Sequence, residues 1–142
     1  MLEKEFLDNI DCKFPYNDIK KAEKLVKTAV LISDNSVFWI IHELVRPPKS
    51  MTWKINKTDS IGLLNYIDNN FWHPLKTDIL SISKRVIEND AFNEEEILLV
   101  MNQLKDYKWL HTALNILYFI CDDFDWKIEE KYNEIILHWD TV

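Results

Sequence analysis

A single glycine, Gly62, in a chain of 142 residues is the feature that most restricts the fold. Average usage is about 7% glycine, so roughly ten would be expected in a chain of this length. Tight β-hairpins need glycine or asparagine at positive φ, and phosphate-binding loops need glycine so that the backbone can approach the ligand. The shortage of glycine therefore argues against an all-β fold and against a Rossmann-type nucleotide-binding fold.

Apolar residues instead recur with the period of an α-helix along most of the chain. The stripes cover residues 19–30, 37–45, 61–67, 75–86, 97–104, 110–121 and 128–139. They predict an all-α fold of about seven helices, and the length predicts a single domain over residues 1–142. The even spacing of the later helices favours stacked antiparallel pairs of the HEAT type, and a compact helical bundle is the alternative.

Polar residues ahead of the apolar stripes predict where the helices begin. Asn93 and Glu96 form a capping-box pattern, which is the clearest helix start in the chain. The segment 110–121 is apolar almost all round, so we expect it to form the most buried helix. Three further helix starts are expected to have these caps: Asp34 or Asn35, Asp59, and Asp125.

The dipeptide His42-Glu43 is the part of the sequence that most resembles a catalytic motif. A zinc-protease helix needs a second histidine four residues after the first, but Arg46 stands there, and a guanidinium stays protonated. No other histidine or cysteine pair has the spacing of metal ligands, and no phosphate loop, nucleophile elbow or kinase signature is present. We therefore predict a protein without catalytic residues, metal or cofactor, which is not an enzyme.

The helix that contains this dipeptide also predicts a candidate binding surface. Trp39, His42, Glu43 and Arg46 share one face, since they are spaced by three or four residues, and Trp53 lies in the loop that follows. Tryptophan and arginine are frequent in binding hot spots. The structural alternative is that Trp39 covers a neighbouring helix while His42 bonds to the backbone.

Charge is unevenly distributed along the chain. The net charge is −7, and residues 88–142 contain 13 acidic and 4 basic residues. The densest group, here called the acidic knuckle, consists of Asp122, Asp123, Asp125, Trp126, Glu129 and Glu130. Its spacing does not fit a calcium loop, and repulsion from phosphate argues against binding of nucleic acid.

Two interpretations of the acidic knuckle remain open. In the first, its carboxylates cap the last helix and are otherwise solvated. In the second, the knuckle docks a cationic protein and Trp126 supplies an apolar anchor.

A short, acidic, tryptophan-rich helical chain with this knuckle and without a catalytic motif resembles bacterial immunity proteins, which neutralise a toxin domain. The resemblance is one of class over the whole chain, with no site residue carried over. It implies that the partner is a basic, nuclease-type toxin domain. The alternatives are a helical adaptor or structural subunit of a larger assembly, and an enzyme with an unrecognised site.

The remaining sequence features concern the compartment. Cys12 and Cys121 are too few and too far apart for a disulfide framework, which fits a reducing environment. The sequence shows no secretory signal and no apolar run of membrane-spanning length. We therefore expect a cytoplasmic protein that does not contact a membrane.

Overall fold

The computed structural model describes residues 15, 18–45, 55–88, 90, 93–120 and 126–141. These residues form seven α-helices and no strand, which confirms the prediction of an all-α fold. None of these helices combines the length and the apolar character that crossing a bilayer requires. The helices are α2 (Ile19–Ala29), α3 (Asp34–Val45), α4 (Lys57–Asn70), α5 (Lys76–Ile87), α6 (Glu94–Leu104), α7 (His111–Ile120) and α8 (Trp126–Thr141).

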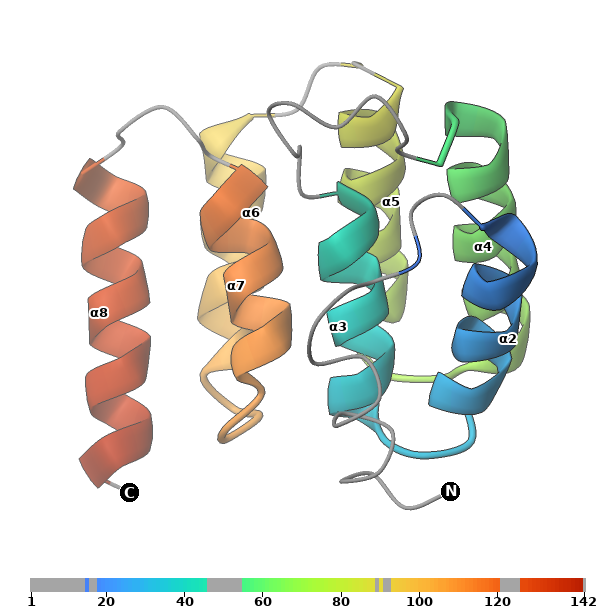
Figure 1. Ribbon diagram of the computed structural model, residues 1–142. Coiled ribbons are helices and arrows are strands. Elements are labelled where there is room, and N and C mark those ends of the chain that lie inside the picture. The colour runs from blue at the N-terminus through green and yellow to red at the C-terminus, as the bar shows by residue number, and fades with distance from the viewer. Residues whose placement is uncertain are drawn as a thin grey trace.

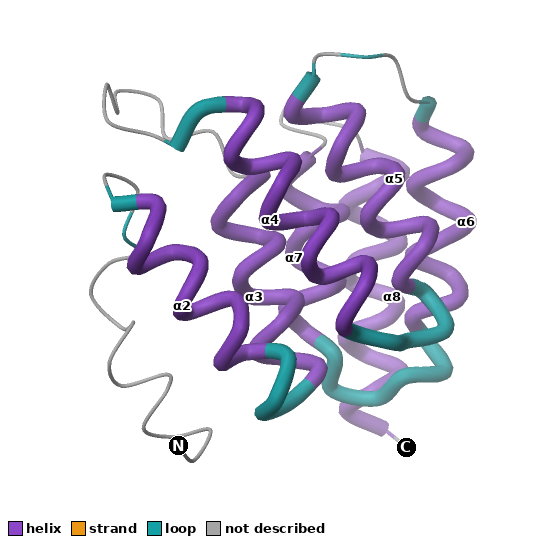
Figure 2. Tube along the Cα trace, turned by 90° about the vertical axis from the view of Figure 1, so that its right-hand side faces the viewer, coloured by secondary structure: helices purple, strands orange, loops and turns teal. Residues whose placement is uncertain are grey.

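The helices are arranged in two layers (Figure 1). Helices α2, α3 and α7 lie side by side in one layer, and α4, α5 and α6 lie in the other. Helix α8 forms one edge of the molecule, where it contacts α6 and α7. Figure 2 views the opposite edge, which α2 and α4 form together.

The most extensive contact between helices joins α3 to α7, which three other helices separate in the sequence. In a solenoid each repeat contacts only its neighbours along the chain. The contact between α3 and α7 therefore identifies the fold as a compact helical bundle, and not as a stack of helix pairs.

The capping box predicted for α6 is present. The side-chain oxygen of Asn93 accepts a hydrogen bond from the amide of Glu96 at 2.8 Å. The carboxylate of Glu96 accepts a hydrogen bond from the backbone of Asn93 and also binds Arg85 of α5. The helix start and the contact between α5 and α6 thus depend on the same glutamate.

Two other predicted caps were wrong. Helix α4 is capped by Asn56, whose side chain accepts a hydrogen bond from the amide of Asp59 at 2.8 Å. At the start of α3, the hydroxyl of Ser33 accepts from the amide of Ser36 at 3.2 Å, so neither Asp34 nor Asn35 is the cap. In both places a polar residue further upstream reaches the third amide of the helix. The remaining predicted cap, Asp125, lies outside the described residues.

Helix α3, and not α7, is the most buried helix of those described. Seven of the 12 residues of α3 are buried, against four of the 10 residues of α7. Helix α3 packs against α2, α4, α5 and α7, and α7 packs against α3, α5, α6 and α8, but the Phe119 side chain of α7 remains half exposed. The prediction for 110–121 was therefore wrong, because apolar composition alone does not reveal which side chains of a helix its neighbours cover.

Three connections between helices converge at one end of the molecule, namely residues 30–33, 71–75 and 105–110 (Figures 1 and 2). The ring of His73 lies 5.3 Å from that of Phe38 in α3 and 4.9 Å from that of Tyr107. The Nδ1 atom of His73 accepts a hydrogen bond from the amide of Leu75 at 3.1 Å. The buried imidazole thus fixes two of the connections against α3.

Candidate partner-binding surfaces

The described part of the acidic knuckle is the first turn of α8. Trp126 is 60% exposed, Glu130 is exposed and Glu129 is half-buried. The ammonium of Lys127 lies 5.9 Å from the centre of the Trp126 ring and 3.8 Å from a carboxylate oxygen of Glu94. An exposed indole therefore lies within one turn of two carboxylates. The other predicted members, Asp122, Asp123 and Asp125, lie outside the described residues.

The second candidate surface is largely covered where the structure describes it. Trp39 is half-buried against the core, and the side chains of His42 and Glu43 are 14% and 13% exposed. The His42 ring lies 5.5 Å from that of Phe119, at the contact between α3 and α7. Such burial of Trp39 is what the structural alternative predicts. Arg46 and Trp53 lie outside the described residues, so binding through this face stays a prediction.

Several exposed apolar side chains were not singled out from the sequence. Leu137 of α8 and Leu99 of α6 are 64% and 62% exposed. Leu31, Trp72 and Trp109 are also exposed, and each lies in one of the three connections that converge at one end. The sequence does show that Trp126 and Leu137, which are eleven residues apart, share a helix face, but it does not show that this face is exposed.

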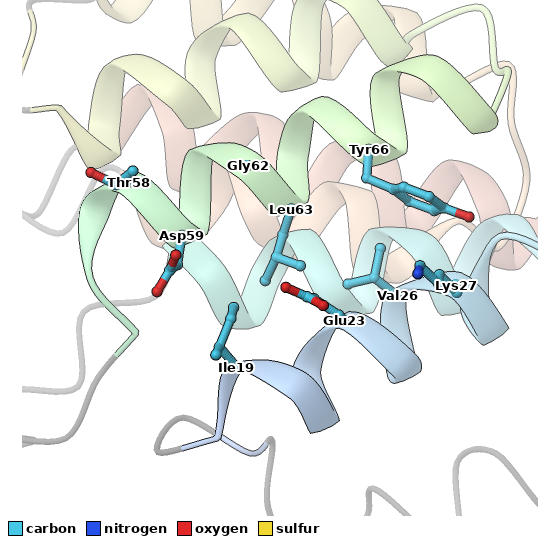
Figure 3. Close-up of a pocket in the computed structure, with 9 residues that line it drawn as sticks. All are labelled: Ile19, Glu23, Val26, Lys27, Thr58, Asp59, Gly62, Leu63 and Tyr66. Carbon is cyan, nitrogen blue, oxygen red and sulfur yellow. The ribbon is translucent and has the colours of Figure 1, made fainter.

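A groove with a volume of about 310 Å³ lies between α2 and α4 (Figure 3). Its walls carry the carboxylates of Glu23 and Asp59, and the ammonium of Lys27 lies 5.9 Å from the centre of the Tyr66 ring. Gly62 forms part of the lining, and a methyl group at this position would meet no atom within 4 Å. Among the described residues, histidine, cysteine and serine are absent from the lining, so the groove shows no serine or cysteine nucleophile and no nitrogen or sulfur ligand for a metal.

Lys105, which follows α6, and Lys131 of α8 form ion pairs. Glu134 of α8 accepts from Lys131 at 2.7 Å and from Lys105 at 3.0 Å. These two hydrogen bonds lower the pKa of the Glu134 carboxyl. Between α5 and α6, the guanidinium of Arg85 binds both carboxylate oxygens of Glu96, which lowers the pKa of Glu96 and raises that of Arg85.

In the part of the chain that the structure describes, no three histidine, cysteine, aspartate or glutamate side chains are grouped so that they could hold a metal ion. The chain matches no protein-family model, no curated protein and no solved structure. Its function is therefore inferred from the chemistry of its exposed surface.

Proposed function

We propose that the protein is a binding module that neutralises a basic, nuclease-type bacterial toxin domain by direct contact, as immunity proteins do. The observation that carries this proposal is the exposure of Trp126 at the first position of α8, beside Glu129 and Glu130. Tryptophan is the residue type most enriched in hot spots, where its burial by a partner contributes much of the binding energy. The carboxylates around it favour a partner of positive charge and accelerate its approach.

The charge balance of the C-terminal helices supports a basic partner. Lys105, Lys127 and Lys131 lie in ion pairs with glutamates of α6 and α8, which reduces their effect on an approaching cation. Glu129 and Glu130 form no ion pair with any described residue. A net negative surface remains at the start of α8.

A helical adaptor subunit is a second candidate function, and a different observation favours it. Leu31 and Trp72 are 86% and 74% exposed on connections that lie at the same end of the molecule (Figure 1), and Trp109 is exposed on the third connection there. Grouped exposed apolar residues mark interaction sites more often than single ones. An adaptor would use this end, together with the α8 surface, to join two proteins.

The proposal predicts that a toxin domain is encoded beside the gene of this protein, and the experiment is a challenge of cells with that toxin domain. Cells that express the protein should survive, and cells that lack it should die. In stopped-flow measurements, the association rate of the two purified proteins should fall as salt increases, since the charge attraction is screened. A neighbouring gene set without any toxin, or survival that does not depend on the protein, would contradict the immunity proposal.

A matched pair of charge reversals tests the role of α8. Glu130→Lys should slow association by about threefold to tenfold, because it changes local charge in the interface. Glu23→Lys on α2 makes the same change in net charge at the opposite edge of the molecule (Figure 1) and should leave the rate close to that of the wild type. If Trp72→Ala abolishes binding while Glu130→Lys has no effect on it, the adaptor function is favoured instead.

A further inference from the structure

The outer face of α8 is an exposed stripe with an apolar residue near each end. Trp126, Glu130, Asn133 and Leu137 follow one another at intervals of four, three and four residues, so they lie on one side of the helix. All four side chains are exposed. At a rise of about 1.5 Å per residue, the Trp126 and Leu137 positions are ~16 Å apart along the helix axis.

The opposite stripe of α8 faces the rest of the molecule. Ile128, Ile135 and Trp139 are buried there, and the Tyr132 ring packs at a tilt against that of Tyr118 of α7, with ring centres 4.4 Å apart. In Figure 1 helix α8 stands at the edge of the two layers, with α6 and α7 on its inner side. The stripe from Trp126 to Leu137 therefore has no neighbouring helix among those described.

The charges around this stripe are predominantly negative. Glu130 lies within it, and Glu129 and Asp140 lie on the flank toward α7; none of these three forms an ion pair with a described residue. The lysines of α8 lie on the other flank, where Lys127 pairs with Glu94 and Lys131 with Glu134. The face thus combines two separated apolar side chains with a negative potential.

We propose that this outer face of α8 receives a cationic amphipathic helix of the partner, which packs along α8 and places apolar residues on Trp126 and Leu137. The inference rests on the proposed function, since it specifies the chemistry of the partner at the same end of the chain. Two helices packed along their length meet through residues repeated every three or four positions, which is the spacing found here. Basic residues beside the apolar stripe of the partner helix would face Glu129, Glu130 and Asp140.

A second copy of this chain is a poorer occupant of the same face. Two copies of α8 packed together would bring Glu129, Glu130 and Asp140 of one protomer toward the same carboxylates of the other. Like charges brought together at an interface oppose association. A cationic helix would instead be attracted by the same carboxylates.

The test uses a fluorescein-labelled synthetic helical peptide with one leucine stripe flanked by lysines, and the full-length protein. Fluorescence anisotropy should show binding that weakens with added salt. Leu137→Ala and Trp126→Ala should each weaken binding by about tenfold or more, as expected when the apolar side chains that the peptide covers are truncated. A peptide of the same composition with its leucines dispersed around the helix should bind more weakly than the amphipathic one.

Leu99→Ala on α6 is the matched control, since Leu99 is exposed to nearly the same extent as Leu137. It should leave the affinity for the peptide unchanged, and all three variants should keep the thermal melting temperature of the wild type. Equal affinity of the Leu137→Ala variant and the wild type, equal losses at Leu99 and Leu137, or dimerisation through α8 would overturn the inference. If the cognate toxin still binds with salt-dependent kinetics while the peptide does not, the proposed function survives and the helix-docking inference fails.

Discussion

The indole nitrogen of Trp139, near the end of α8, donates a hydrogen bond to the backbone carbonyl oxygen of Lys105, 3.1 Å away. Lys105 directly follows α6, and its side chain reaches back to Glu134 of α8 at 3.0 Å. The Trp139 ring also meets the edge of His111 at the start of α7, with ring centres 5.0 Å apart. One buried tryptophan therefore joins α8 to the region where α6 ends and α7 begins.

Replacement of Trp139 by phenylalanine should lower the free energy of unfolding by about 1–3 kcal/mol, because the partly buried carbonyl of Lys105 loses its donor. Urea denaturation monitored by circular dichroism would measure the change. Trp126→Phe is the control, since that indole is exposed, and it should leave the midpoint nearly unchanged. Equal effects of the two substitutions would show that the hydrogen bond contributes little.

The buried side of α7 gives a second prediction. Leu114 is fully buried in α7, and Leu114→Ala should cost about 2–5 kcal/mol through lost transfer energy and the cavity that remains. Leu99→Ala, at an exposed position of α6, should cost less than about 0.5 kcal/mol. A loss below this value at Leu114 as well would indicate that the surrounding side chains close the cavity.

The fold class could be predicted from the sequence because the shortage of glycine and the helical period are local properties of the chain. The arrangement of the helices could not be predicted, since nothing in residues 34–45 indicates that residues 111–120 will pack beside them. The helix starts were also only partly predictable from the sequence. Asn93 was identified because Glu96 completes its pattern, whereas Ser33 and Asn56 were overlooked beside acidic residues that resemble caps.

His73 predicts a dependence of stability on pH. Burial lowers the pKa of His73 below its ordinary value of 6.5, and the nearby charge of Asp34 opposes this shift to a smaller degree. The unfolded chain therefore binds the proton at a higher pH than the folded chain does. The free energy of unfolding should be fully retained above the ordinary pKa and should fall as the pH drops through about 6.5.

Urea denaturation at about pH 7.5 and about pH 5.5 would test this dependence, in a range above that in which carboxylates usually titrate. Glu96 and Glu134 have lowered pKa values, so their contributions are lost only as the pH falls further. His73→Asn should reduce the difference between the two pH values, although the variant is less stable at both. His138→Asn, at an exposed position, should preserve the difference, and a reduction there equal to that of His73→Asn would contradict the role of His73.

Gly62 lies in the interior of α4, where glycine costs about 0.5–1 kcal/mol relative to alanine. Because a methyl group would meet no atom within 4 Å, Gly62→Ala should raise the free energy of unfolding by about that amount. A thermal melt of the variant beside the wild type would measure the gain. Asn65→Gly, at an exposed position of the same helix, should have the opposite sign.

The candidate site was only partly predictable from the sequence, because the exposure of a side chain depends on how the helices pack. Trp126 was identified because it lies among acidic residues, and such a cluster is visible in the sequence without any knowledge of the fold. Leu137 was overlooked because its exposure depends on which side of α8 faces α6 and α7. A leucine in a helix is usually buried, so its exposed position is evident only once the neighbouring helices are placed.

The contact between α3 and α7 also determines the order in which a growing chain can become stable. Helix α3 leaves the ribosome before α4, α5 and α6, and its most extensive neighbour, α7, follows only after them. Until residue 120 has been synthesised, the side of α3 that packs against α7 in the folded protein remains uncovered. A nascent chain that pauses within α6 would therefore present this surface to chaperones and proteases. The folding rate should depend more on bringing α3 and α7 together across the intervening helices than on forming any single helix.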